Sequence, residues 1–345
     1  MSLVPLSKRV ILERTEHAFE NQAVLNPAVY QEGDITHLWY RAVHHGNFSS
    51  IGYAKFRGDE LVHRSPHPIV RPQFAYEQHG LEDPRVVCID GTFYLFYTVY
   101  DGCDVQVAYA TSEELPHFRK HRVISPHITL RELHRWCSDL GQKEHLSFFC
   151  QTHFPPDGPD DNTLLMEKDV FLFPRRIHGR LALIHRIKPD IQLIYCRNLS
   201  ELSKSKWIRH LNLLEGAIVL NQKYDFESAY IGGGAPPIET SAGWLMIYHA
   251  VEENGSKRTY RAGAALLDID HPEIATHRLP YPLFSPEESW EKVGDVGNVV
   301  FPTGALVRDG ILDIYYGAAD TRIGKISFEL NHLLNELLKH PVSRN

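Results

Sequence analysis

Several ionisable residues of this chain lie at the start of apolar segments whose composition is typical of β-strands. The first group is Asp83, Pro84 and Arg85, which precede the apolar run 86–89. A carboxyl group in a shielded pocket has a raised pKa, which lets it act as a general acid near neutral pH. Asp83 is therefore a candidate proton donor. Because proline restricts the residue before it, we expect an extended backbone at Asp83.

Three cationic or titratable side chains occupy similar places further along the chain. Lys168, Arg186 and His249 lie in or beside apolar runs. Recognition of an oxyanion such as phosphate needs several convergent donors with fixed positive charge, and these residue types can supply them. The alternative is that they form internal ion pairs with acidic side chains. The acidic candidates for such pairs are Asp169, Glu227 and Asp320.

A repeated strand-turn-strand unit would position these residues. In its clearest copy, an apolar run up to Ile89 meets the Asp90-Gly91 turn and returns as 92–100, and a third strand follows at 105–112. Five such units have their heads near residues 27, 84, 169, 235 and 299. The other predicted strands are 24–30, 37–43, 50–54, 168–174, 181–186, 191–196, 234–238, 244–249, 261–268, 298–302, 311–320 and 325–328.

Repeats of this kind are typical of β-propeller blades, and a two-sheet sandwich would not explain five similar units. We therefore predict an all-β fold: one five-bladed β-propeller domain over 1–345, with a short C-terminal helix over 331–340. In a propeller the innermost strands line a central channel, so polar residues from different blades converge there. The alternative is that each polar residue only pins its own blade. The converging set is Asn26, Arg41, Asp83, Arg85, Lys168, Asp169, Arg186, His249 and Asp320.

Bulk composition excludes some classes of partner. The formal net charge of the 345 residues is -7, which disfavours a nucleic-acid footprint. No stretch reaches membrane-spanning length and no leader pattern opens the chain, so we expect no membrane partner and a cytoplasmic location. The five cysteines suit reduced thiols.

A loop-like insertion over about 127–162 is rich in histidine, proline and aspartate. Its potential zinc ligands have spacings that match no tight motif, so we predict no bound metal. Those residues are His134, Cys137, His145, Cys150 and His153. The glycine run 232–234 opens no helix, so it indicates close backbone approach and not a phosphate loop.

The motifs at 80–85, 168–174, 243–249 and 316–321 together resemble glycoside hydrolase family 130, the β-mannoside phosphorylases and related β-mannosidases. The resemblance spans about 26–330. It implies a five-bladed propeller and an inverting attack on a terminal β-mannosyl unit.

The resemblance also implies roles for individual residues. Asp83 corresponds to the family's general acid, thought to act through a hydroxyl of the mannose ring. Asn26, Arg41 and Asp320 match positions that hold the mannose, and Arg85 of the same motif joins this substrate-binding set. Lys168, Arg186 and His249 match positions around the phosphate, where Tyr260 provides a further substrate contact.

Two activities of the family differ in what they need. A phosphorylase needs one acid and a basic cradle, because phosphate is already an anionic nucleophile; an inverting hydrolase needs a second carboxylate to activate water. The cations favour phosphorolysis that gives α-mannose 1-phosphate, with inorganic phosphate as co-substrate and no cofactor.

Alternatives to the phosphorylase remain open at this point. One is a β-mannosidase acting on β-1,2-mannosides, with Glu227 as its base; the segment 101–104 also lacks an arginine that some phosphorylases carry. Another is a non-catalytic propeller that binds a glycan or a protein. The sequence leaves open the linkage, the acceptor sugar and whether the chain forms a homo-oligomer.

Overall fold

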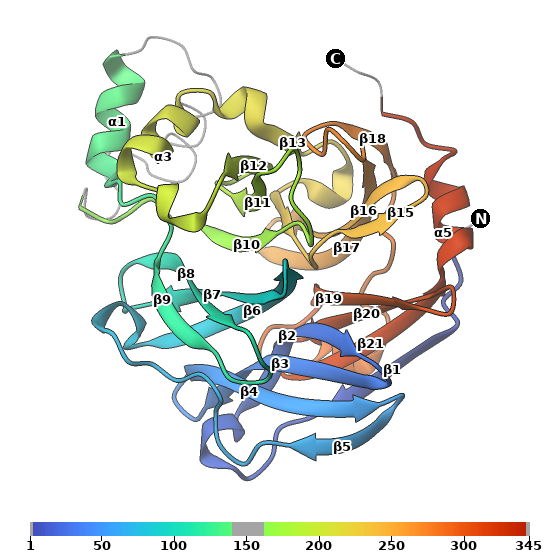
Figure 1. Cartoon of the computed structure of the whole chain (residues 1–345). Coiled ribbons are helices and arrows are strands. Elements are labelled where there is room, and N and C mark those ends of the chain that lie inside the picture. The colour runs from blue at the N-terminus through green and yellow to red at the C-terminus, as the bar shows by residue number, and fades with distance from the viewer. Residues whose placement is uncertain (1–2, 140–161, 343–345) are drawn as a thin grey trace.

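Apolar runs joined by tight turns form antiparallel meanders throughout the chain (Figure 1). The computed structural model describes residues 3–139 and 162–342, and the all-β prediction is confirmed. After the N-terminal strand, the first two meanders contain β2 (Ala23–Glu32), β3 (Ile35–His44), β4 (Phe48–Arg57), β5 (Glu60–Arg64), β6 (Gly80–Ile89), β7 (Thr92–Tyr100), β8 (Val105–Ser112) and β9 (Arg119–Val123). They form one eight-stranded sheet, in which a single parallel pair, Ser49 and Gly80, connects two antiparallel meanders.

Three further sheets follow. One contains β10 (Lys168–Leu172), β11 (Leu181–Arg186), β12 (Ile191–Cys196) and β13 (Ile218–Leu220). The next contains β14 (Tyr230–Gly233), β15 (Ile238–Thr240), β16 (Gly243–Asn254), β17 (Lys257–Leu267) and β18 (Ala275–Arg278). The last contains β19 (Val300–Arg308), β20 (Ile311–Ala318), β21 (Arg322–Glu329) and the N-terminal strand β1 (Ser7–Leu12), which pairs antiparallel with β21.

The first strands of the meanders approach one another in the middle of the molecule. β2 contacts both β19 and β6, and β10 contacts both β6 and β14. Figure 1 shows the sheets arranged around these strands. Polar residues at the heads of the strands are thereby brought together from distant parts of the sequence.

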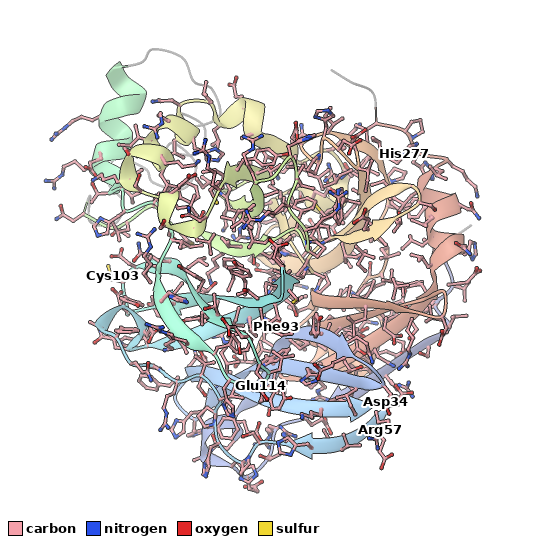
Figure 2. All side chains as sticks on the ribbon, in the orientation of Figure 1. Asp34, Arg57, Phe93, Cys103, Glu114 and His277 are labelled. Atoms are coloured by element: carbon pink, nitrogen blue, oxygen red, sulfur yellow. The ribbon has the colours of Figure 1, made fainter. Side chains whose placement is uncertain are left out.

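The core lies between neighbouring sheets and, in the eight-stranded sheet, between its two meanders, because most strands bury both faces. For example, Phe93 of β7 meets Tyr30 of β2 edge-on, with ring centroids 5.0 Å apart, and Figure 2 shows Phe93 inside the molecule. Apolar burial of this kind contributes about 25 cal/mol for each Å². The helix predicted over 331–340 is confirmed as α5 (Leu330–Leu337), which buries Leu333 and Leu337.

Four meanders share one buried polar contact. In each, a glutamate in a short helical turn accepts a hydrogen bond from a tyrosine on the second strand of the meander and pairs with a cation. The turns are η1 (Ala18–Glu20), η2 (Ala75–Glu77), η5 (Asp225–Glu227) and α4 (Ser289–Lys292). The sets are Glu20 with Tyr40 and Arg64, Glu77 with Tyr97 and Lys120, Glu227 with Tyr248 and Arg278, and Glu291 with Tyr316 and Lys8. We call them the Glu-Tyr-cation clusters.

The sheet β10–β13 has histidines in the corresponding place. His185 of β11 precedes Arg186 as Tyr40 precedes Arg41. Its Nε2 shares a hydrogen bond of 2.7 Å with Nε2 of His210 from α3 (Lys204–Leu211), and its Nδ1 lies 3.3 Å from Oε1 of Glu167. Burial raises the pKa of Glu167 to about 8. Folding at neutral pH is therefore coupled to the uptake of a proton by Glu167.

We expect Glu167→Gln to raise the thermal unfolding midpoint, by about 2 °C or more at pH 8. The pKa of Glu167 rises from 4.5 to about 8 on folding, so the wild type loses stability as pH rises across that window, and no further above it. Glutamine has a similar shape and no charge to bury. Melting curves at pH 5, 7 and 9 should show a gain that is small at pH 5 and largest above pH 8. A gain that is the same at every pH would contradict this explanation.

The strand predicted over 234–238 is wrong. β14 ends at Gly233 and β15 begins at Ile238, and both pair with β16. Pro236 and Pro237 have no N–H to donate to the ladder, so pairing stops there and resumes beyond them. The glycine run does provide the predicted close approach, since a Cβ at Gly234 would collide with the carbonyl oxygen of Ile247.

The predicted loop insertion is partly wrong. Residues 130–139 form α1 (Leu130–Asp139), which buries Leu130 and Leu133. The missed signal is a capping box, in which the Glu132 carboxylate accepts from the Thr129 N–H at 3.0 Å and the Thr129 hydroxyl accepts from the Glu132 N–H at 3.2 Å. Residues 140–161 of the insertion, with His145, Cys150 and His153, lie outside the described residues, as do the side chains of His134 and Cys137.

Other short helical turns are η3 (Leu199–Glu201) and η4 (Leu214–Ala217). Within 3–139 and 162–342, no helix is long and apolar enough to cross a membrane. The same ranges contain no group of three His, Cys, Asp or Glu side chains placed to hold a metal ion.

Candidate active site

Three inner strands have a β-bulge at the polar residue of the strand head. The pairing register shifts between Leu25 and Ala28 in β2, and shifts in the same way in β6 and β10. One residue in each bulge has a left-handed backbone. These are Asn26 (φ 50°), Asp83 (φ 51°) and Asp169 (φ 58°). Bulges re-aim side chains and are common beside active sites.

The extended backbone predicted for Asp83 is therefore wrong. Pro84 disfavours the right-handed helical region for Asp83, but the extra residue of the bulge requires a left-handed turn, and β-ladder pairing on both sides fixes it. Aspartate and asparagine tolerate this conformation better than most residues. The bulge places the Asp83 carboxylate next to Asn26, whose Nδ2 donates to Oδ1 of Asp83 at 2.7 Å.

Glu82 joins two strand heads, a role that the sequence analysis missed. Nη2 of Arg41 donates to Oε1 of Glu82 at 2.8 Å, and Nζ of Lys168 donates to Oε2 at 3.1 Å. Burial opposes the charge on Glu82, but Lys168 and Arg41 outweigh it and lower the pKa of Glu82 to about 2. The neighbouring residues Arg41, Asp83 and Lys168 are thus held around one permanent anion.

A second buried carboxylate, Asp169, holds the cations of the other half. Its Oδ2 lies 3.1 Å from Nε of Arg186 and 3.8 Å from Nε2 of His249, and its Oδ1 lies 3.9 Å from Nη2 of Arg85. Burial raises the pKa of Asp169, but the guanidinium groups of Arg186 and Arg85 lower it below its ordinary value. Of the ion pairs left open by the sequence, that of Arg186 with Asp169 is present.

His249 does not provide the fixed positive charge predicted for it. Burial lowers the pKa of His249 to about 3, against the opposing effect of Asp169. At neutral pH the imidazole is uncharged. It therefore offers one donor and one acceptor to a ligand, and the fixed cations beside Asp169 are Arg186 and Arg85.

Asp320 lies in the hairpin turn between β20 and β21, where Ala319 and Asp320 both have left-handed backbones (φ 45° and 50°). Burial raises the pKa of Asp320 to about 6, with Arg41 opposing and the Asp83 charge adding to the rise. Asp320 thus shares one electrostatic environment with Arg41 and Asp83. The structure brings these three predicted residues together.

An aromatic group borders the cations. The hydroxyls of Tyr230 and Tyr260 share a hydrogen bond of 2.8 Å. The centroids of the His249 and Phe301 rings are 4.3 Å apart. The sequence analysis named Tyr260 but neither Tyr230 nor Phe301. Their signal was weak, because an aromatic residue at a strand end is common in any β core.

The cluster contains buried polar atoms with no hydrogen-bond partner. In the described part of the chain these include Oδ1 of Asn26, Nε of Arg41, Nη2 of Arg85 and both ring nitrogens of His249. Buried polar groups are normally hydrogen-bonded, because leaving them unpaired costs about 1–3 kcal/mol each. Unpaired atoms gathered from several strands indicate a site that a polar ligand completes.

Glu227 does not lie in this cluster. Its Oε1 accepts from Nη2 of Arg278 at 2.6 Å and from the Tyr248 hydroxyl at 2.7 Å. Its Oε2 accepts from the backbone N–H groups of Lys223 and Tyr224. The side chain is fully buried. Among the described contacts, none joins Glu227 to another predicted site residue.

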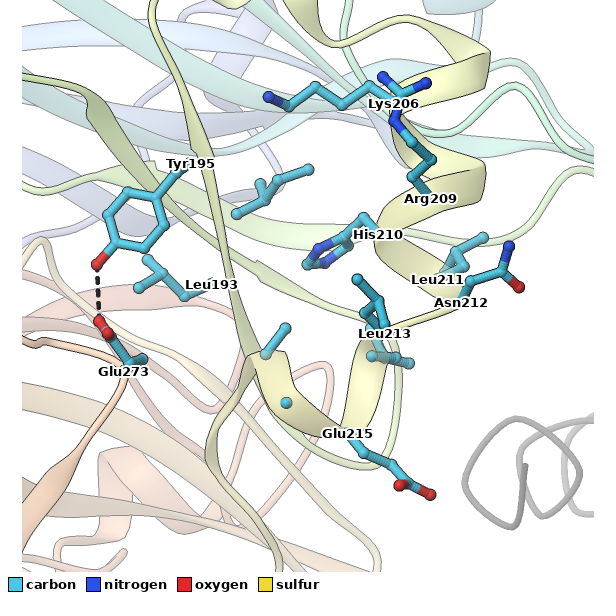
Figure 3. A pocket seen from close by; sticks show the side chains of 14 residues that line it. Leu193, Tyr195, Lys206, Arg209, His210, Leu211, Asn212, Leu213, Glu215 and Glu273 are labelled. Carbon is cyan, nitrogen blue, oxygen red and sulfur yellow. Dashed lines mark hydrogen bonds between the residues drawn. The ribbon is translucent and has the colours of Figure 1, made fainter. Parts of the chain in front are cut away.

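A surface hollow of about 870 Å³ lies elsewhere, between β12, α3 and η4 (Figure 3). Leu193, His210 and Leu213 line it, and at its edge the Tyr195 hydroxyl donates to the Glu273 carboxylate at 2.7 Å. None of the predicted site residues lines this hollow. Its size alone does not make it the site, because convergent polar groups are what a ligand site requires.

Comparison with known proteins shows which family this chain resembles. A family model described as beta-1,4-mannooligosaccharide phosphorylase, of glycoside hydrolase family 130, matches residues 4–147 and 157–339. Two curated relatives from Thermoanaerobacter sp. (strain X514) are each 32% identical. They are a 1,2-beta-oligomannan phosphorylase, with 94% of this chain and 96% of the relative covered, and a beta-1,2-mannobiose phosphorylase, with 93% and 95% covered.

Solved structures share the fold. A beta-1,2-mannobiose phosphorylase from Listeria innocua, in complex with beta-1,2-mannobiose, has a TM-score of 0.69 at 20% identity, covering 98% of this chain and 96% of its own. A structure of glycoside hydrolases in the GH130 family that target beta-1,2 mannosidic linkages has a TM-score of 0.71 at 20% identity, covering 100% and 96%. Given the extent of the family match, this chain belongs to glycoside hydrolase family 130.

Proposed function

We propose that this enzyme cleaves terminal β-linked mannosides with inorganic phosphate and releases α-mannose 1-phosphate. The observation that carries the proposal is the presence, in one cluster, of the Asp83 carboxyl group and the fixed cations Lys168 and Arg186, which are held by the neighbouring carboxylates Glu82 and Asp169. The two relatives at 32% identity, both named as phosphorylases of β-1,2-mannosides, support it. The substrates are then a β-mannoside oligosaccharide and phosphate.

We infer that the meanders are five blades of one propeller domain spanning 1–345. The support is the set of contacts among β19, β2, β6, β10 and β14, together with the repeated Glu-Tyr-cation clusters. In this arrangement the strand heads face a common axis, which explains why residues more than 100 positions apart contact the same carboxylate.

The proposed roles follow from position. Asp83 gives its proton to a hydroxyl of the mannose ring, which passes its own proton to the glycosidic oxygen as the bond breaks. Asn26 fixes the orientation of the Asp83 carboxyl group through the bond of 2.7 Å. The mannose contacts are assigned to Asn26, Arg41, Arg85 and Asp320, and the phosphate contacts to Lys168, Arg186, His249 and Tyr260.

Phosphate needs no base. An oxygen of the dianion attacks the anomeric carbon from the face opposite the leaving oxygen, so the configuration inverts from β to α. Arg186 and Lys168 hold the anion in line and offset its charge. A hydrolase would need a second carboxylate beside water, and we infer that Glu227 is not this group because its oxygens are occupied in a buried Glu-Tyr-cation cluster.

We further propose a cytoplasmic location and no cofactor beyond the phosphate co-substrate. The chemistry supports the absence of a cofactor, because the proposed reaction needs one acid and a set of anion-binding residues but no redox or Lewis-acid group. The net charge of -7 supports the absence of a nucleic-acid partner.

Product analysis tests the proposal. The enzyme is incubated with β-1,2- and β-1,4-linked mannobiose, with and without inorganic phosphate. We expect mannose 1-phosphate only when phosphate is present. Free mannose released at the same rate in both conditions would overturn the proposal and make the enzyme a hydrolase, while no product from either disaccharide would favour a glycan-binding role.

We expect Gly232→Ala to lower kcat/KM for phosphorolysis by about 100-fold or more, because small misplacements of positioned groups have effects of this size. A Cβ at Gly232 would collide with the His249 ring and with Oδ2 of Asp169. The control is Gly216→Ala, since a Cβ there meets nothing within 4 Å. Steady-state rates of the two folded variants provide the measurement, and equal rates would show that the site tolerates the displacement.

A further inference from the structure

Lys188, two residues beyond β11, lies over an aromatic ring at the cationic end of the site. Its ammonium nitrogen is 4.0 Å from the centroid of the Tyr230 ring, and the Arg186 guanidinium carbon is 5.0 Å from the same centroid. Tyr230 is buried and hydrogen-bonded to Tyr260. Two cations therefore meet one ring beside the residues assigned to phosphate.

The charges around Lys188 are mainly positive. No ion pair in the described part of the chain joins Lys188 to a carboxylate, and its one described contact is the Tyr230 ring. The carboxylate in its electrostatic environment, Asp169, is already paired with Arg186. A half-buried ammonium among cations is costly unless an anion joins it.

We propose that Lys188 is a further phosphate-binding residue of this site. It contacts the inorganic phosphate in the forward reaction and the phosphate of mannose 1-phosphate in the reverse reaction. The inference rests on the phosphorolysis proposed above. While no anion is bound, the Lys188 nitrogen lies over the Tyr230 ring, which favours the charged form by a cation–π interaction, and the flexible four-carbon stem lets the nitrogen move from the ring to the anion.

If Lys188 binds phosphate, its protonation should change on binding. The charged and titratable groups facing Lys188 are Arg186 from β11, Lys168 and Asp169 from β10, Arg258 from β17 and Tyr230 from β14. Burial and the three cations lower the pKa of Lys188 to about 7, while Asp169 opposes. A bound phosphate dianion would raise that pKa, so phosphate binding at pH 7.5 draws a proton onto Lys188.

The test compares Lys188→Met and Lys188→Arg with the wild type. A matched control is Lys223→Met, because the Lys223 ammonium also lies over a tyrosine ring, that of Tyr224 at 5.7 Å. We expect Lys188→Met to raise KM for phosphate about 10-fold or more and to leave KM for mannobiose unchanged, since a charged partner is lost from one substrate only. Lys223→Met should change neither constant.

Calorimetry measures binding without turnover. Inorganic phosphate is titrated into each protein at pH 7.5 in two buffers of different ionisation enthalpy, which reports the protons taken up. We expect Lys188→Met to bind phosphate more weakly. We expect Lys188→Arg to keep most of the affinity but to take up fewer protons than the wild type, because arginine is always charged.

The outcomes separate the two proposals. Unchanged phosphate affinity and KM in a folded Lys188→Met protein would overturn the role of Lys188, as would equal losses for phosphate and mannobiose. Proton uptake by Lys188→Arg equal to that of the wild type would also overturn it. Failure of the wild type to form mannose 1-phosphate would overturn phosphorolysis instead, whatever the calorimetry shows for Lys188.

Discussion

Asp83→Asn is expected to lower the rate of phosphorolysis by about 10³-fold or more with every aglycone, while the protein still folds. Asparagine has the shape of aspartate, and its Oδ1 can accept the same hydrogen bond from Asn26 that now spans 2.7 Å. It also tolerates the left-handed backbone at φ 51°. The one function it lacks is an acidic proton for the leaving group.

Asp90→Asn is the matched control. Asp90 has the same left-handed backbone, at φ 51°, but lies in an exposed turn where it pairs with Arg176. We expect normal turnover from this variant. Rates with mannobiose and phosphate, together with thermal melting of each protein, give the comparison. Near-normal turnover of Asp83→Asn would remove Asp83 from the mechanism.

The second and third strands of the meanders were predictable because their residues are of strand type and their turns are distinctive. The predicted strands 92–100 and 105–112 coincide with β7 and β8. The short outer strands β5 and β9 were missed, because they are polar and largely exposed and carry no apolar alternation. The partner of β1 was also out of reach, since β1 joins β21 from the other end of the chain and local sequence contains no signal for that pairing.

The sequence predicted which residues form the candidate site better than it predicted how they are arranged. Asp83, Arg186 and Asp320 were identified from motifs, and the structure places them in one cluster. The bulge that turns Asp83 left-handed depends on register between two strands, which the residues before Pro84 do not encode alone. Lys188 was missed for a related reason, since a lysine just past a strand resembles an ordinary solvated end until Tyr230 is placed beneath it.

The largest effect on stability is expected from Glu227→Gln, which should lower the free energy of unfolding by about 3–5 kcal/mol, as loss of one partner of a buried ion pair does. Arg278, itself buried, would be left without its anion at 2.6 Å, and the Tyr248 hydroxyl would bond to a weaker acceptor. The phosphorolysis rate of the folded fraction should stay unchanged, because none of the described contacts links Glu227 to the substrate cluster.

Glu20→Gln is the matched control for this prediction. Glu20 is equally buried and makes the same contacts in another meander, with Arg64 at 2.9 Å and the Tyr40 hydroxyl at 2.7 Å. If both glutamates are structural, denaturant titration should show similar losses of stability for the two variants, and both should keep their rates below the unfolding transition. If Glu227 instead activates water, only Glu227→Gln loses turnover. That difference, measured at matched folded fraction, would restore the hydrolase interpretation and leave the other three Glu-Tyr-cation clusters as the structural set.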